Sequence, residues 1–382
     1  MKRLRAAGLV LAGASLLSSC TATSARIPTL AERTAEQLRQ RGVDPTVAAI
    51  PFAITPEMHT WLFARVGRGG GAQERLSSLL RSLLGKDGVR LVYESGYTGT
   101  AQEVFRSGRA NCLSFAHLFV GMARELGMPV YFLRVQQVTS FAKEGDLIVA
   151  SGHITAGYGP PNDRRVLEFT EQPLGPYHGL EEISDLTAVA LFHSNRGAEL
   201  LRQGELSEAR RWLELAARID PDLPDAWVNL GVVRRRLRDL AGAEAAYRRA
   251  LEADPTTFAA YQNLASLLQF LGRTREVQEL LELLDRNRNR SRNPFSYLAL
   301  GDLSLREGRL DEAERFYRRA LRLDSSQAET QAALGELALA RGRERDARQH
   351  LRKAVRLDAG HPRVVRLAQR LSAKLPPATA RP

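Results

Sequence analysis

A repeat of about 34 residues governs the second half of the chain. Glycines recur with this period, or with about twice this period, at Gly197, Gly231, Gly301 and Gly335. Alanines follow each of these glycines at two fixed distances, at Ala209, Ala243, Ala313 and Ala347 and at Ala216, Ala250, Ala320 and Ala354. A single helix pair cannot bury its apolar face alone, so repeated pairs stack into a solenoid. The period therefore predicts an all-α solenoid over residues 190–375.

The unit from Ala226 to Pro255 resembles the tetratricopeptide repeat. It contains Ala226-Trp227, Leu230-Gly231, Ala243, Tyr247, Ala250 and Pro255 at the spacing of that family. The resemblance implies about five repeats, a degenerate third repeat, a capping helix at Val364–Leu375 and a concave surface that binds peptides or proteins. Residues 376–382 are expected to be a disordered tail.

Three asparagines follow the same period. Asn195, Asn229 and Asn263 are equally spaced, and each stands shortly before the small residue of a helix crossing. Stacking would align them as a ladder on the inner surface, where an amide can donate to and accept from a peptide backbone. The alternative is that these asparagines are solvated and bind nothing.

Before the repeats, the segment Gly108–Pro129 predicts a helix that begins with a cysteine. Asn111 can cap the helix, and the helix ends at Gly127 before a proline. Cys112 then occupies the first turn, where the helix dipole favours a thiolate and free N–H groups can hold an oxyanion. The alternative is a small buried cysteine that fills the core.

A histidine and a carboxylate follow the cysteine in chain order. Turn residues Pro160–Asp163 separate His153 from Glu168, so the two are expected on neighbouring antiparallel strands. Cys112, His153 and Glu168 would then supply a nucleophile, a base and a group that orients the base.

The stretch Cys112-Leu-Ser-Phe-Ala-His-Leu-Phe-Val-Gly-Met-Ala-Arg-Glu-Leu-Gly-Met-Pro resembles the core motif of the transglutaminase-like (papain-like) superfamily. His153 matches the family's histidine, and Glu168-Phe169-Thr170 matches its Asp-x-Thr. The resemblance implies an α+β domain over about residues 27–185 that acts on amide bonds of polypeptides, by hydrolysis rather than cross-linking. Two departures, glutamate in place of aspartate and Ile154 in place of an aromatic residue, leave a second hypothesis. In that hypothesis the domain is inert and the protein is an envelope scaffold.

The chain begins like an exported lipoprotein. Basic residues precede a short apolar run, and Leu17-Ser18-Ser19-Cys20 resembles a lipobox. Residues 1–20 are therefore expected to be a signal peptide, with lipid on Cys20 anchoring the protein to a bacterial membrane on its periplasmic side. Thr21 after the cysteine favours the outer membrane.

Cysteine count and charge narrow the remaining functions. The chain has two cysteines, so a lipidated Cys20 would leave Cys112 as an unpaired thiol. No spacing of His and Cys suggests a metal site, and no cofactor is expected. The 55 Lys and Arg against 43 Asp and Glu give a net charge of +12. Because no aromatic pattern interleaves the arginines, nucleic acid is not an expected partner.

Overall fold

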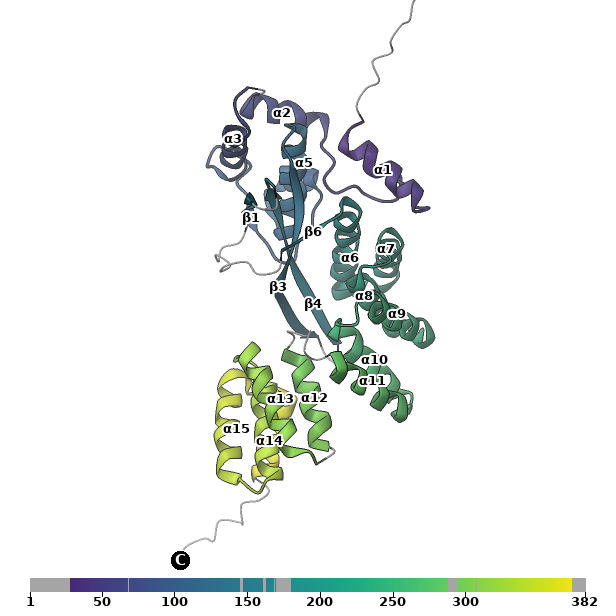
Figure 1. Ribbon diagram of the computed structural model, residues 1–382, viewed down its shortest axis with the longest axis vertical. Helices are drawn as coiled ribbons and strands as arrows, with labels where there is room; N and C mark the ends of the chain where they lie inside the picture. Colours follow the sequence, from purple (N-terminus) through teal and green to yellow (C-terminus); the bar gives the residue numbers. More distant parts are fainter. Residues whose placement is uncertain are drawn as a thin grey trace, which may run out of the picture.

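The computed structural model describes residues 28–67, 69–144, 147–160, 163–167, 169, 180–287, 294–306 and 308–372. Predictions on residues 1–20, Cys20, Glu168 and residues 376–382 lie outside these ranges. Side chains of residues 136–144 and 147–152 are also outside the description. Figure 1 shows helices around a sheet, a long β-hairpin, and a curved stack of helix pairs.

In the described part of the chain, four helices precede the cysteine, and capping residues explain where two of them begin. They are α1 (Leu30–Gln40), α2 (Pro56–Val66), α3 (Ala72–Leu84) and α4 (Ala101–Ser107). Thr29 and Thr100 each form a capping box with a glutamate three residues on, which satisfies N–H groups that the first turn leaves unpaired.

The sheet is antiparallel and has the order β5–β4–β3–β6. Its strands are β3 (Val130–Glu144), β4 (Leu147–Tyr158), β5 (Arg165–Leu167) and β6 (Leu180–Ile183). A separate parallel pair joins β1 (Val92–Tyr93) to β2 (Arg109–Ala110). Strand β3 continues past Phe141, because β3 and β4 pair as far as Glu144 and Leu147. They form the long hairpin that reaches the repeats in Figure 1.

The repeats form the predicted helix pairs. The pairs are α6 (Asp185–Gln203) with α7 (Leu206–Ile219), α8 (Pro224–Arg236) with α9 (Leu240–Ala253), α10 (Phe258–Phe270) with α11 (Thr274–Asn287), α12 (Pro294–Arg306) with α13 (Leu310–Leu323), and α14 (Ala328–Ala340) with α15 (Glu344–Asp358). Helix α16 (Pro362–Ser372) covers the last pair.

The periodic glycines are sites of close helix approach. A Cβ at Gly231 would lie 2.4 Å from the Tyr247 ring, and one at Gly301 would lie 2.4 Å from the Tyr317 ring. Both tyrosines are fully buried. The regular spacing of glycine therefore reflects a packing requirement that recurs from pair to pair.

The first repeat shares its core with the α+β domain. Ala188, Ala190 and Ala216 belong to the same apolar cluster as Phe119 and Phe132. Helix α6 runs without a break through residues 185–190, where the sequence predicted a domain boundary. The Arg124 guanidinium donates to both carboxylate oxygens of Asp185 at 2.8 Å. The two regions meet through a continuous core rather than a linker.

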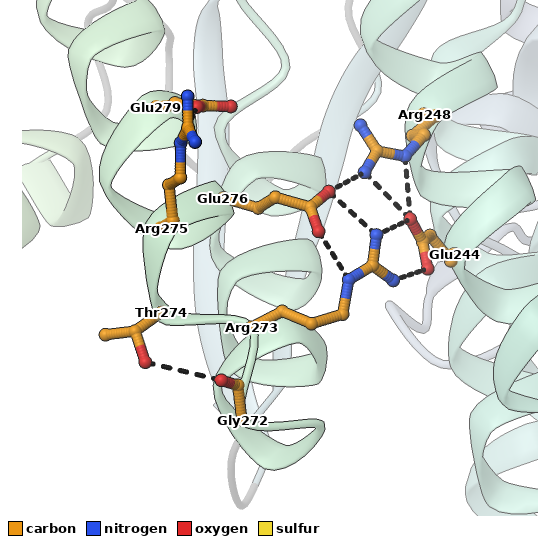
Figure 2. A network of polar contacts seen from close by, with 8 residues as sticks. All are labelled: Glu244, Arg248, Gly272, Arg273, Thr274, Arg275, Glu276 and Glu279. Carbon is orange, nitrogen blue, oxygen red and sulfur yellow. Dashed lines mark hydrogen bonds and ion pairs between the residues drawn. The ribbon is translucent and has the colours of Figure 1, made fainter.

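Charged side chains join neighbouring repeats on helices α9 and α11. Figure 2 shows the Arg273 guanidinium between Glu244 and Glu276, with Arg248 bonded to the same two carboxylates. Both Arg248 and Arg273 are therefore bonded to carboxylates of two neighbouring repeats.

No helix in the described part of the chain has both the length and the apolar character needed to cross a membrane.

Candidate functional site

Cys112 is the first residue of α5 (Cys112–Glu125), as predicted. Its side chain is half-buried and is a free thiol. Asn111 has the extended backbone of a capping residue, and its Oδ1 accepts a hydrogen bond from the Ser114 N–H at 2.8 Å. The thiol therefore lies at the positive end of a capped helix of 14 residues.

A buried polar network holds the cap in one orientation. The Asn111 Nδ2 donates to the Thr98 hydroxyl at 2.9 Å. The Ser114 hydroxyl contacts Asn111 Oδ1 at 2.8 Å and accepts from the Gly99 N–H at 2.8 Å. Thr98, Asn111 and Ser114 are all buried. The segment before α4 therefore fixes the start of the cysteine helix.

His153 lies on β4, opposite Val135 of β3. Its side chain is only 6 % exposed, and the register shifts directly after this pair. Ile154 and Ala156 of the same strand belong to the apolar core that contains residues of α5. Since strand residues alternate between faces, His153 is on the other face, with Thr155. Pairing of His153 with Cys112 stays a prediction.

Glu168 lies outside the described residues, but Leu167 and Phe169 on either side of it are described. Strands β4 and β5 are antiparallel, with Ala156 opposite Leu167. The Phe169 ring stacks on Phe115 with centroids 4.6 Å apart. Phe115 is in the first turn of α5, so the chain after β5 returns to the helix end that bears the cysteine.

Two other histidines are core residues rather than parts of this site. His117 packs edge-on to Phe132 and Phe192, and burial lowers its pKa to about 3. Burial also lowers the pKa of His193 to about 4, and its Nε2 lies 3.2 Å from the carbonyl of Ala49. Both are neutral at pH 7.

The asparagine ladder is only partly as predicted. Asn195 and Asn229 are half-buried, and Asn229 Nδ2 donates to Ser194 of the preceding repeat at 3.3 Å. Asn263 is fully buried, and neither amide atom has a hydrogen-bond partner. Strand β4 lies against α10, the helix that carries Asn263. Asn263 therefore does not line an open inner surface, because the hairpin packs on its helix.

Sequence reasoning missed Thr98, Ser114 and Glu199. Glu199 is on α6 and is 9 % exposed, and burial raises the pKa of its carboxyl. Nothing in the local pattern predicts this burial, which depends on the fold. Among the described residues, no group of three or more His, Cys, Asp or Glu could hold a metal ion.

Family models agree with this arrangement. Residues 72–141 match the transglutaminase-like superfamily. Residues 195–256, 263–328 and 304–371 match tetratricopeptide repeats. The chain is a transglutaminase-like domain followed by tetratricopeptide repeats. The first match includes Cys112 and ends before His153, so it supports the cysteine helix more directly than the triad.

Each of the individual relatives below covers less than half of this chain. The chain is 36 % identical to Protein O-mannosyl-transferase TMTC1 of Mus musculus over 84 residues. These 84 residues are 22 % of this chain and 9 % of that protein. MamA from Desulfovibrio magneticus RS-1 is 21 % identical, with a TM-score of 0.34 over 45 % of this chain and 97 % of its own. PilF of Pseudomonas aeruginosa is 23 % identical, with a TM-score of 0.39 over 48 % and 83 %. YrrB, described as having an unusual peptide-binding site, is 19 % identical, with a TM-score of 0.34 over 47 % and 92 %.

Proposed function

We propose that this protein is an exported, lipid-anchored enzyme that uses Cys112 to attack amide bonds of polypeptides. The observation that carries the proposal is the half-buried free thiol at the first position of a capped helix. The helix dipole lowers the free energy of a thiolate there. A domain of the transglutaminase-like superfamily surrounds it.

The chemistry assigns one role to each group. The Cys112 sulfur attacks the substrate carbonyl while His153 accepts the thiol proton. The amine leaves with that proton, and a thioester to Cys112 remains. Water then attacks the thioester with His153 as base, which releases the acid and restores the thiol. Glu168 orients His153 in this scheme.

The start of α5 supplies donors for the oxyanion. The cap engages the N–H groups of Ser114 and Phe115 through the Asn111 side chain and carbonyl. The N–H groups of Cys112 and Leu113 come before them and point out of the helix end. A tetrahedral oxyanion beside the Cys112 sulfur would meet these two donors.

The repeats would bind the polypeptide substrate or a partner protein. Tetratricopeptide repeats form a curved inner surface suited to peptides, and Asn195 and Asn229 keep part of their surface exposed on α6 and α8. Lipid on Cys20 would hold the protein on the periplasmic side of a bacterial envelope membrane, with the outer membrane favoured by Thr21.

A second candidate is a non-catalytic scaffold that acts through its repeats. It is favoured by the position of His153 on the sheet face opposite Ile154 and Ala156, which pack with α5. In that case Cys112 has no base and the domain supports the repeats mechanically.

The alkylation rate of Cys112 against pH separates the two candidates. The chain without residues 1–20 leaves Cys112 as its single thiol. We expect Cys112 to be alkylated faster at neutral pH than a free cysteine, with the rate falling in His153→Ala and staying unchanged in His361→Ala. His361 is a matched control because it lies in the repeats at the start of α16. An ordinary alkylation rate that does not change in His153→Ala would reject the enzyme.

A further inference from the structure

We propose that Tyr93 is a specificity-determining residue, which together with Phe169 receives an apolar side chain next to the amide bond that Cys112 attacks. This inference rests on the proposed function, because it names the class of polypeptide that the enzyme would take. It is carried by a row of aromatic rings that begins in the buried helix of Cys112 and ends at the surface.

The row of rings becomes more exposed toward its outer end. Phe115 of α5 is buried, and its ring stacks on the Phe119 ring with centroids 5.9 Å apart. The Phe115 ring also stacks on Phe169, with centroids 4.6 Å apart. The Phe169 ring contacts the Tyr93 ring with centroids 6.1 Å apart and planes at 55°. Because Phe169 is half-buried and Tyr93 is 37 % exposed, these two rings form a partly exposed apolar corner.

Two separate links place this corner beside the thiol. Phe115 follows Cys112 by three residues on α5, which makes them neighbours on one face of the helix. Tyr93 of β1 is paired with Ala110 of β2, two residues before Cys112. The Glu94 N–H donates to the Ala110 carbonyl at 2.8 Å and fixes this pairing. Since paired strands lie about 4.8 Å apart and one residue spans at most about 3.6 Å, the Cα atoms of Tyr93 and Cys112 lie within about 12 Å of each other.

The charged side chains beside the corner bond to each other. Glu94 follows Tyr93 along the chain, and its two carboxylate oxygens accept from the Arg109 guanidinium at 2.6 Å each. The same guanidinium lies over the Tyr97 ring, 4.5 Å from its centroid. Both charges are therefore matched, and the two rings of the corner offer mainly apolar surface. An aromatic or branched aliphatic side chain of a polypeptide suits that surface, because aromatic rings pack favourably at an angle.

Alkylating reagents that carry one amino-acid side chain test the inference. The chain without residues 1–20 has Cys112 as its single thiol. Chloroacetyl-amino acid amides place the side chain after the reacting carbon, and acetyl-amino acid chloromethyl ketones place it before that carbon. Each series contains phenylalanine, glycine and glutamate. The Cys112 sulfur displaces chloride and forms a thioether, and each rate is divided by the rate of the same reagent with free cysteine.

We expect the phenylalanine reagent of at least one series to react about tenfold faster than its glycine counterpart, as for an apolar group that enters a hydrophobic site. The glutamate reagent should gain nothing. Tyr93→Ser should abolish the preference for phenylalanine, and Tyr93→Phe should keep it. Val92→Ser is the matched control, because Val92 is 64 % exposed on the other face of β1 and should not contribute.

The outcomes separate this inference from the proposed function. Equal rates for the three side chains in both series would overturn the subsite, and the enzyme would stand if His153→Ala still slows alkylation. A preference for phenylalanine that survives Tyr93→Ser, or that Val92→Ser abolishes equally, would also overturn it. A preference that requires Tyr93, at a rate that His153→Ala does not change, would support the apolar site and reject the enzyme. Should Tyr93→Ser fail to fold, Tyr93→Gln keeps more of the volume and gives the same answer.

Discussion

The first and the last repeats have the same period but different neighbours. Helices α6 and α7 bury Ala188, Phe192 and Ala216 among aromatic and aliphatic residues of the transglutaminase-like domain. The apolar clusters of α12 to α16 contain residues of the repeats only. Similar repeat sequences can therefore serve as part of a globular core or as a solenoid, depending on what packs against them.

The two regions also stabilise buried polar groups differently. The core near the first repeat holds the neutral histidines His117 and His193. At the other end, the Arg363 guanidinium of α16 donates to Asp302 at 2.7 Å and to Glu336 at 2.7 Å. The stability of the first region should therefore fall in acid, and the stability of the second region should depend on an ion pair.

The largest effects should come from the cores themselves. Phe192→Ala and Tyr317→Ala each remove a fully buried ring and should cost about 3–5 kcal/mol of unfolding free energy. All three tryptophans, Trp61, Trp212 and Trp227, lie in or against the shared core. In urea unfolding, Phe192→Ala should shift the fluorescence transition, whereas Tyr317→Ala should shift only the helical circular dichroism. Identical shifts of both signals in both variants would mean that the chain unfolds as one cooperative unit. That result would contradict the division into a core at the first repeat and a core at the last repeats.

A comparable effect is expected at the far end from Arg363→Met. Arg363 is 7 % exposed, so the substitution leaves Asp302 and Glu336 without their buried counter-charge. The cost should be about 3–5 kcal/mol, confined to the last repeats. Arg309→Met is the control, because the Arg309–Glu312 pair is half exposed and should contribute at most about 1 kcal/mol. Unfolding would be measured by circular dichroism. An equal loss of unfolding free energy in the two variants would argue against a special role for Arg363.

Lowering the pH should reduce the unfolding free energy of the first region. The folded pKa values of His117 and His193, about 3 and about 4, lie below the ordinary 6.5. The unfolded chain therefore binds more protons below pH 6.5, and each histidine destabilises the fold by up to about 1.4 kcal/mol per pH unit. The fluorescence transition should move to lower urea between pH 6.5 and 5.

The substitution His117→Phe isolates the contribution of one histidine to this dependence of stability on pH. Glu199 and Asp225 act in the opposite sense, because burial raises their pKa values. His117→Phe should therefore reduce the slope of stability against pH, while His361→Phe in the last repeats should not. A slope that is unchanged in His117→Phe would refute the assignment.

The smallest effect should come from the charged network of Figure 2. Glu244→Gln weakens its bonds to Arg248 and Arg273, which are both partly exposed. Because solvent and salt screen such pairs, the melting temperature should fall only slightly, and the difference should disappear in 1 M salt, where the Debye length is about 3 Å. A large, salt-independent loss would mean that the network does more than join repeats.

Much of this structure could be predicted from local sequence. The repeat period predicted the helix pairs, and Asn111 predicted the start of the cysteine helix. Cys112 could be placed because Asn111 is a capping residue and the apolar face of a helix follows it. The cysteine then occupies the first turn of that helix. Each of these inferences uses residues that lie within a few turns of one another.

What sequence could not show depends on contacts between distant segments. Periodicity predicts that α6 has an apolar face, but it does not show that Phe192 on α6 packs against His117 of α5. Asn263 has the spacing of a groove residue, yet β4 lies against its helix. Glu199 has the sequence context of an exposed helix carboxylate, yet the fold buries it.

Native-state hydrogen exchange tests the shared core most directly. In the chain without residues 1–20, we expect the amides of α6 and α7 to open with the same free energy as those of α5. The amides of α14 and α15 should open with a different free energy, and Phe192→Ala should lower the first value alone. If α6 and α7 instead exchange together with α14 and α15, and independently of α5, the first repeat belongs to the solenoid and not to the domain that carries Cys112.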